Sequence, residues 1–347
     1  MLPGGSLLPV LALLTAAYAG LVLLRNRRLV RPPILGIDGA PLPERTFTLS
    51  DGETVDYVVV GPTDPTVEDS APIAQPIFLV PGADGMKETF RYQVPALARH
   101  RKVVCATLRR KLTREDTFDR MVDDVAEIAA DVLSTHDSKR FVLLGQSLGG
   151  AIAMRFATRY PDRVAGLVLS NTLARIAYSH VGLNRAALAP LAMSTTRYLP
   201  TGISRLLARA WSRLEVWIYD ASPGSERIID YSLWTGTRTV PSSVSNARVA
   251  LLKKIDLRPT LPSIRSPTLV LKGPRDHYVP PAWSHEIVAL VPGARYQEVA
   301  GTGHCSHLSM PGSFNGLLLG WLESVVDGSG EEPSPGAHPR PVTEVGQ

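Results

Sequence analysis

One serine of the chain lies between two glycines in a tight Gly-x-Ser-x-Gly pattern that runs from Gly145 to Gly149. The preceding run, Phe141–Leu144, is apolar and of strand length, and a helix is predicted from Leu148 onward. Between a strand and a helix this pattern forms a sharp turn that exposes the serine hydroxyl. Glycine is needed at both outer positions because larger side chains would collide. The spacing therefore predicts that Ser147 is a nucleophile.

A serine hydroxyl needs a general base, and that base needs an acid to orient it. Of eight histidines, His304 directly follows the last predicted strand, at the sheet edge where catalytic loops gather. Asp276 follows the predicted strand Thr268–Leu271 and precedes His304 by one helix–strand unit. We therefore predict that Ser147, Asp276 and His304 form a catalytic triad. An exposed turn aspartate is the alternative for Asp276. The rival acid position, after the strand near Leu169, carries no carboxylate.

The oxyanion of a tetrahedral intermediate needs two hydrogen-bond donors. The backbone N–H of Leu148, at the start of the helix behind the nucleophile, is predicted to be one. The other should come from the loop after the strand Ile77–Val80, where Gly82 lets the backbone approach closely. We assign it to the N–H of Ala83. Asp84 would oppose an oxyanion, so we expect it to point away or to cap the next helix.

This chemistry requires no metal and no organic cofactor, and we predict neither. The trio His304, Cys305 and His307 fits no familiar zinc spacing. The only other cysteine is Cys105, and two cysteines exclude a disulfide scaffold or a Cys-rich metal module. We expect His307 to pack or to cap locally.

Short apolar runs that alternate with amphipathic helices must position these residues. Such alternation indicates a mostly parallel sheet with helices on both faces. The first two strands form a hairpin around Asp51-Gly52. The predicted strands are 46–50, 55–60, 77–80, 103–107, 141–144, 167–169, 268–271 and 296–299, and the predicted helices are 118–132, 148–159, 283–290 and 314–325. Residues 172–255 show no clear strand, which predicts a helical cap over the carboxyl ends of the strands.

The N-terminal segment Ser6–Leu24 carries no charge. As a helix it would span about 29 Å, close to the ~30 Å hydrocarbon core of a bilayer. We predict a single membrane span within an anchor and basic flank at 1–31. A signal peptide cleaved after Ala19 and a buried core helix remain alternatives. Four arginines between Arg25 and Arg31 predict a cytoplasmic catalytic domain and contact with membrane lipid.

The rest of the chain divides into a hydrolytic domain at 40–326 and a tail at 327–347, whose Gly, Ser, Pro and Glu content predicts disorder. With 347 residues and 44% hydrophobic residues, the chain is neither fibrous nor a multi-span membrane protein. The net charge of +5 is a mild excess, so we predict no nucleic-acid partner. The cap region 175–254 holds eleven basic residues against four acidic ones. A solvated face or an anionic lipid surface would each explain that excess.

Together these motifs resemble the α/β-hydrolase superfamily over roughly residues 46–325. The resemblance rests on Pro81-Gly82, where the family usually has His-Gly, on the nucleophile segment 145–150, on 273–276 with Pro280, and on Gly303-His304. Ser309 stands where many relatives carry Glu. Residues 167–176 resemble the enol-lactonase-like branch, and an anchor before a capped serine hydrolase resembles membrane-bound monoacylglycerol lipases.

The resemblance implies an α/β-hydrolase fold and a serine hydrolase that cleaves a carboxylic ester through an acyl-enzyme. A hydrophobic or lipid-like ester is the expected small-molecule substrate. A lactonase or carbon–carbon bond hydrolase would use the same triad. Transfer to another acceptor and a non-catalytic scaffold that binds a protein partner remain alternatives.

Overall fold

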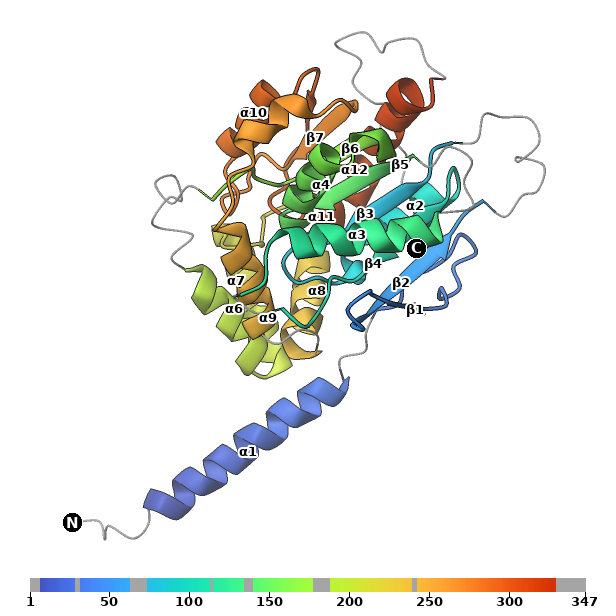
Figure 1. Ribbon diagram of the computed structural model, residues 1–347. Coiled ribbons are helices and arrows are strands. Elements are labelled where there is room, and N and C mark those ends of the chain that lie inside the picture. The colour runs from blue at the N-terminus through green and yellow to red at the C-terminus, as the bar shows by residue number, and fades with distance from the viewer. Residues whose placement is uncertain are drawn as a thin grey trace.

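The computed structural model describes residues 7–28, 32–62, 74–112, 115–133, 140–176, 188–238 and 242–328 (Figure 1). The tail predicted at 327–347 lies almost wholly outside the described residues, as does Arg31 of the basic flank.

An eight-stranded sheet forms the centre of the molecule, in the order β1-β2-β4-β3-β5-β6-β7-β8. The strands β3 to β8 pair in parallel, and β1 and β2 pair antiparallel at one edge, as predicted for a hairpin. The strands are β1 Arg45–Thr48, β2 Thr54–Val60, β3 Ile77–Val80, β4 Val103–Ala106, β5 Phe141–Gln146, β6 Val164–Ser170, β7 Thr268–Lys272 and β8 Arg295–Glu298. All eight predicted strands are therefore confirmed.

Helices cover both faces of the sheet because the central strands are apolar on both sides. Phe78, Leu143 and Leu169 pack into one core with α3, α4 and α10. Leu79 and Leu144 pack into a second core with α2 and α12. The helices around the sheet are α2 Gln93–Ala98, α3 Asp119–Val132, α4 Leu148–Arg159, α10 Pro281–Leu290, α11 Ser306–Ser309 and α12 Pro311–Trp321, with shorter turns η1 Lys87–Phe90, η2 Pro161–Arg163, η4 Arg258–Ser263 and η5 Leu322–Val326.

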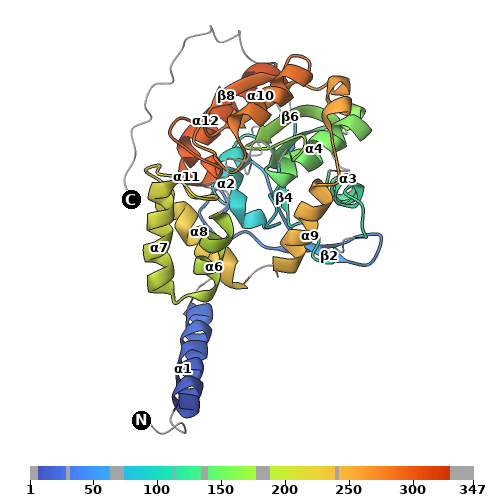
Figure 2. The same cartoon turned by 90° about the vertical axis from the view of Figure 1, so that its left-hand side faces the viewer.

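The insertion between β6 and β7 is helical, as predicted. It contains α6 Ala189–Tyr198, α7 Thr201–Leu214, α8 Ser225–Arg238 and α9 Ser242–Leu252. Three of them, α6, α7 and α8, pack on one another at one end of the body, and α9 packs on α4 (Figure 2). A third core joins this cap to the body, where Tyr219 and Ile228 meet Met86, Cys305 and Leu308. These body residues lie in the segments that follow the carboxyl ends of β3 and β8, so the cap covers the edge predicted for it.

The N-terminal helix α1, Leu7–Arg28, projects away from the body (Figure 1). It continues through Arg25, Arg27 and Arg28, so three charges stand at one end of the same helix. In the described part of the chain, no helix combines the length and the apolar character that a bilayer crossing needs. The predicted span at Ser6–Leu24 is therefore not supported.

Candidate active site

The turn between β5 and α4 holds Ser147 in a conformation that few non-glycine residues adopt, with φ 53° and ψ −119°. The packing around the turn explains both flanking glycines. A Cβ atom at Gly145 would collide with the carbonyl of Gly149, and one at Gly149 would collide with the carbonyls of Val80 and Pro81. The N–H of Ser147 donates to the carbonyl of Ser170 on the next strand, at 2.9 Å. The strained turn is thus fixed from both sides, and the Ser147 side chain is only partly buried.

The predicted acid and base meet at the same edge of the sheet. Nδ1 of His304 lies 3.0 Å from Oδ2 of Asp276, and both side chains are buried. The other ring nitrogen of His304, Nε2, lies 3.4 Å from the side-chain amide of Gln146, the residue before Ser147. The edge of the Tyr278 ring lies against the imidazole. No hydrogen bond joins His304 to Ser147 in the described part of the chain, but Gln146 brings the imidazole beside the serine turn.

The Asp276 carboxylate accepts five hydrogen bonds. Oδ1 accepts the N–H groups of Tyr278 and Val279, at 3.1 and 2.8 Å. Oδ2 accepts from His304, from Lys272 at 2.6 Å and from the side-chain amide of Asn171 at 2.9 Å. Burial alone would raise the pKa of Asp276, but the charge of Lys272 and the bonds to His304 outweigh it, so the pKa lies well below its usual range. Asp276 therefore carries a negative charge near neutral pH.

Asn171 and Lys272 are functional positions that the sequence reasoning missed. Asn171 directly follows β6, at a position where only a carboxylate was sought, and its amide also donates to the carbonyl of Gly303 at 2.9 Å. Ser306 donates in turn to Oδ1 of Asn171. Lys272 ends the apolar strand β7, and a lysine at the end of a buried strand was the available signal for it.

The predicted oxyanion loop faces the serine turn. Gly82 lies so close that a Cβ atom there would collide with the side chain of Gln146. The N–H groups of Ala83 and Leu148 take part in no backbone hydrogen bond among the described residues. Two unpaired N–H groups beside the nucleophile suit a developing oxyanion.

Two cap residues hold the oxyanion loop. The guanidinium of Arg248 on α9 donates to the carbonyl of Ala83 at 2.9 Å, and Tyr231 on α8 donates to Oδ2 of Asp84 at 2.6 Å. Oδ1 of Asp84 also accepts the N–H of Met86. The following turn η1 has no side-chain cap, so Asp84 does not form the helix cap that was one of the two expectations for it. Burial raises the pKa of Asp84, and burial lowers the pKa of Arg248 to about 10. The cap therefore takes part in forming the site.

A third cap residue holds the loop that carries His304. Asp220 is fully buried, and its Oδ2 accepts the N–H of Gly303 at 2.8 Å. Its Oδ1 accepts the N–H and the hydroxyl of Ser222. Glu215 nearby pairs with Arg275 and His277 on the loop that carries Asp276. The segment after α7 thus contacts both loops that follow β7 and β8.

His307 does not belong to the reactive group, as predicted. Its Nε2 lies 2.7 Å from the Thr89 hydroxyl, and its ring packs against Phe90 and Phe314. Burial lowers its pKa to about 3, so the ring is neutral near neutral pH.

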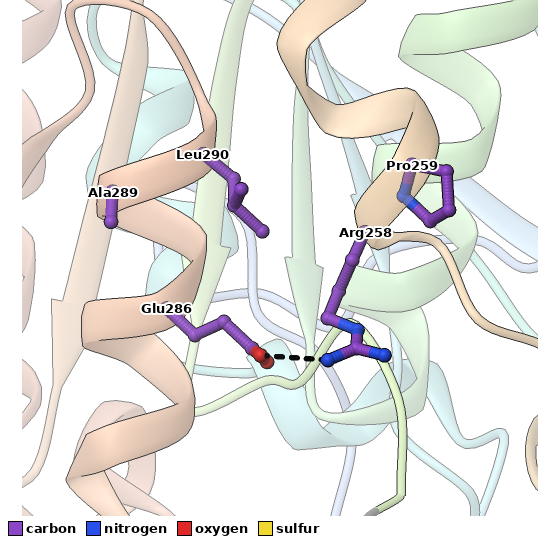
Figure 3. Close-up of a pocket in the computed structure, with 5 residues that line it drawn as sticks. All are labelled: Arg258, Pro259, Glu286, Ala289 and Leu290. Carbon is purple, nitrogen blue, oxygen red and sulfur yellow. Dashed lines mark hydrogen bonds and ion pairs between the residues drawn. The ribbon is translucent and has the colours of Figure 1, made fainter.

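A separate pocket of about 460 Å³ lies between η4 and α10 (Figure 3). It is lined by Arg258, Pro259, Glu286, Ala289 and Leu290, none of which belongs to the predicted site. The Arg258 guanidinium already pairs with Asp256 and Glu286. This open pocket therefore offers no unpaired charge to a ligand, and we do not assign the reaction to it.

Comparison with known proteins gives one family match. A model described as the alpha/beta hydrolase family matches residues 77–317. Polyketide synthase ThaQ of Burkholderia thailandensis is 30% identical over 263 residues, which cover 72% of this chain but only 12% of that protein. The 2-hydroxy-6-oxo-6-phenylhexa-2,4-dienoate hydrolase of Comamonas testosteroni is 27% identical over 193 residues, 53% of this chain and 63% of that protein.

Among solved structures, the enol-lactonase from Burkholderia xenovorans superposes with a TM-score of 0.60 at 22% identity. The match covers 80% of this chain and 99% of the enol-lactonase. At this identity the likeness concerns the fold.

Proposed function

The chain belongs to the alpha/beta hydrolase family, and on that basis we propose that it is a serine hydrolase that cleaves a carboxylic ester. The observation that carries the proposal is the Asp276–His304 hydrogen bond, at 3.0 Å, beside the strained Ser147 turn. A nucleophile, a base and an orienting acid at one edge of a parallel sheet form the group that acyl transfer needs.

In the proposed reaction, Ser147 Oγ attacks the carbonyl carbon while His304 Nε2 takes the hydroxyl proton. The N–H groups of Ala83 and Leu148 bind the oxyanion. Collapse of the tetrahedral intermediate expels the alcohol, which receives the proton from His304. Water then attacks the acyl-enzyme and gives a proton to His304. His304 returns that proton to Ser147 Oγ as the second tetrahedral intermediate collapses to the acid and the free serine. Asp276 stays ionised and holds the imidazole through Nδ1.

A carbon–carbon bond hydrolase is the second candidate, because the Comamonas testosteroni relative is named as a hydrolase of a 2-hydroxy-6-oxo-dienoate, a compound with a keto group and no ester. The two candidates differ in the leaving group, which is an alcohol for an ester and a carbon acid for a vinylogous diketone. A lactonase would release no separate alcohol, because acid and alcohol stay in one product.

The nucleophile is tested with the full chain in mild detergent and a fluorophosphonate probe. Ser147→Ala should retain the fold and lose labelling and hydrolysis by several orders of magnitude, because only the oxyanion donors and binding remain. The exposed serine in Ser263→Ala is the matched control and should leave both unchanged. Labelling of the Ser147→Ala protein at the wild-type rate would refute the assignment.

The substrate class is tested by offering p-nitrophenyl esters of increasing chain length, a lactone and a dienoate diketone to the same protein. We expect the esters to be turned over fastest. Turnover of the diketone alone would favour the second candidate.

We also propose that the protein contacts a lipid surface. Apolar side chains of α1 such as Leu13 and Leu14 are exposed to 72% and 62%, and Ile203 and Leu206 on α7 of the cap are exposed to 51% and 67%. α1 and the cap lie toward the same end of the molecule (Figure 2). A bilayer surface would remove these side chains from water without requiring a helix to span it.

A further inference from the structure

A lysine with no exposed surface lies directly behind the acid of the site. Lys272 is the last residue of β7, and its ammonium donates to Oδ2 of Asp276 at 2.6 Å and to the carbonyl of Val279. These two bonds join the strand end to both ends of the loop 276–279. The ionised partner is what makes a lysine with no exposed surface tolerable, because an unpaired buried charge is strongly unfavourable.

The position of this ammonium matters because it shares one oxygen atom with the imidazole. Oδ2 of Asp276 contacts Nζ of Lys272 at 2.6 Å and Nδ1 of His304 at 3.0 Å. The two nitrogen atoms therefore lie within about 6 Å of each other, and like charges at that distance repel strongly in a buried site. In a triad without the lysine, the carboxylate would stabilise a protonated imidazole with its whole charge. Here Lys272 neutralises much of that charge.

We propose that Lys272 is a positioning residue that fixes Asp276 and opposes protonation of His304 in the free enzyme, so that hydrolysis continues to lower pH. The inference rests on the proposed function. Burial raises the pKa of Asp276, but the charge of Lys272 is the largest of the opposing effects and keeps that pKa below its usual range. Burial also lowers the pKa of Lys272, and the charge of Asp276 opposes this. The role is indirect, because Lys272 contacts neither the serine turn nor the oxyanion loop in any bond of the described residues.

Other groups around the imidazole remain constant in the test. Gln146, Asn171 and Tyr278 contribute uncharged contacts. The cap carboxylate Asp220 reaches the backbone of Gly303, and would favour a protonated imidazole. The other titratable groups around it are Asp84, Cys305 and His307, of which Cys305 and His307 are neutral because burial raises the pKa of that thiol and lowers the pKa of that imidazole.

The test is the pH dependence of fluorophosphonate labelling and of kcat/KM for the full chain. In both measurements the acid limb, which is the pH range in which the rate falls as pH is lowered, is compared between the wild-type chain and its variants. Lys272→Met keeps the length and removes the charge, and should move the acid limb upward by roughly one pH unit or more. Lys272→Arg keeps the charge and should leave the limb near its wild-type position. The plateau rate of Lys272→Met should fall by far less than that of Asp276→Asn, because four donors still hold the carboxylate.

Lys87→Met is the matched control. Lys87 is equally buried and pairs with Glu44 and Glu88, but it contacts no residue of the triad. Its removal should lower the melting temperature and leave the acid limb in place. A folded Lys272→Met protein with the wild-type acid limb would overturn the inference.

If Lys272→Met does not fold, Lys272→Gln replaces it, and a folded Lys272→Gln protein with the wild-type acid limb would overturn the inference. A wild-type chain that neither labels nor hydrolyses would refute the proposed function instead. The two failures are therefore distinguishable.

Discussion

At the scale of single residues, the site depends on a carboxylate whose lone pairs are fully used. Oδ2 of Asp276 receives three donors, of which only His304 takes part in proton transfer. Asn171 and Lys272 hold the same carboxylate oxygen that accepts from His304. The placement of the Asp276 carboxylate relative to His304 therefore depends on side chains that have no part of their own in the proton transfer.

Replacing the acid tests the role of the carboxylate. Asp276→Asn should leave the fold largely intact and reduce kcat by up to ~10⁴, because an amide in this place favours the wrong tautomer of His304. The measurement is steady-state hydrolysis of a short p-nitrophenyl ester. Asn171→Ala removes one of five donors and should reduce kcat by a much smaller factor. Near wild-type turnover of Asp276→Asn would mean that another carboxylate orients the histidine, with Asp84 as the first to replace.

At the scale of elements, the cap is bonded to the loops that carry the reactive groups. Arg248 on α9 and Tyr231 on α8 hold the oxyanion loop, and Asp220 after α7 holds Gly303 next to His304. Gly303 also lies against the Asp220 side chain so closely that a Cβ atom there would collide with it. A change in the cap should therefore alter turnover as well as substrate binding.

Asp220→Asn tests this coupling. The amide can place an N–H where Gly303 needs an acceptor, so we expect the loop to shift and kcat to fall by roughly tenfold or more with a smaller change in KM. The exposed cap residue Asp230, which pairs with Arg205, supplies the control Asp230→Asn. A control that loses as much kcat as Asp220→Asn would show that the effect is general to the cap.

Burial of His307 makes the stability of the α11 region depend on pH. Its pKa is lowered to about 3 in the folded chain, whereas an unfolded histidine titrates near 6.5. The unfolded state therefore binds more protons between these values, and stability falls as pH is lowered through that window. We expect a loss on the order of 3 kcal/mol between pH 6.5 and pH 4 from this residue, within a total that includes other groups.

Urea unfolding at several pH values measures how the free energy of unfolding depends on pH. His307→Asn cannot take up the proton, so its free energy of unfolding should fall less steeply over that window, although it starts lower. Equal slopes for both proteins would contradict the assigned burial of a neutral imidazole.

At the scale of the whole molecule, α1 and the cap, which both carry exposed apolar side chains, lie toward the same end (Figure 2). The exposed α1 side chains and the α7 side chains Ile203, Leu206 and Leu214 are accompanied by arginines of the cap, of which Arg205 and Arg209 pair with Glu226. Apolar contact and attraction to anionic head groups would then act together.

Vesicle sedimentation tests this combination. The full chain should bind phosphatidylserine vesicles more than phosphatidylcholine vesicles, and salt should weaken the difference, because the Debye length falls from ~10 Å at 0.1 M to ~3 Å at 1 M. Ile203→Gln with Leu206→Gln should reduce binding to both lipids. Equal binding to both vesicle types at low salt would indicate that the positive charge is merely solvated.

The strands of the sheet, and the places of Ser147, Asp276 and His304 at their carboxyl ends, could be predicted from the sequence alone. The strands can be recognised in the sequence because a parallel strand buried on both faces must be apolar throughout. The serine turn can be recognised because its close packing requires glycine at positions 145 and 149. Residues that follow parallel strands also gather at one edge, so placing Asp276 and His304 after strands was enough to bring them together.

The side chains that bond to Asp276 and to the His304 loop could be identified only from the tertiary structure. Asn171 and Asp220 are far along the chain from their partners, and no local spacing signals a hydrogen bond across neighbouring strands or from a cap to a loop. Lys272 lies only four residues before Asp276, but its contact depends on the turn at Gly273, whose space is fixed by the carbonyl of Gly303. The membrane span expected at Ser6–Leu24 is an example of a sequence prediction that the structure does not support. The apolar run forms part of a helix, but no helix in the described part of the chain is long and apolar enough to cross a bilayer.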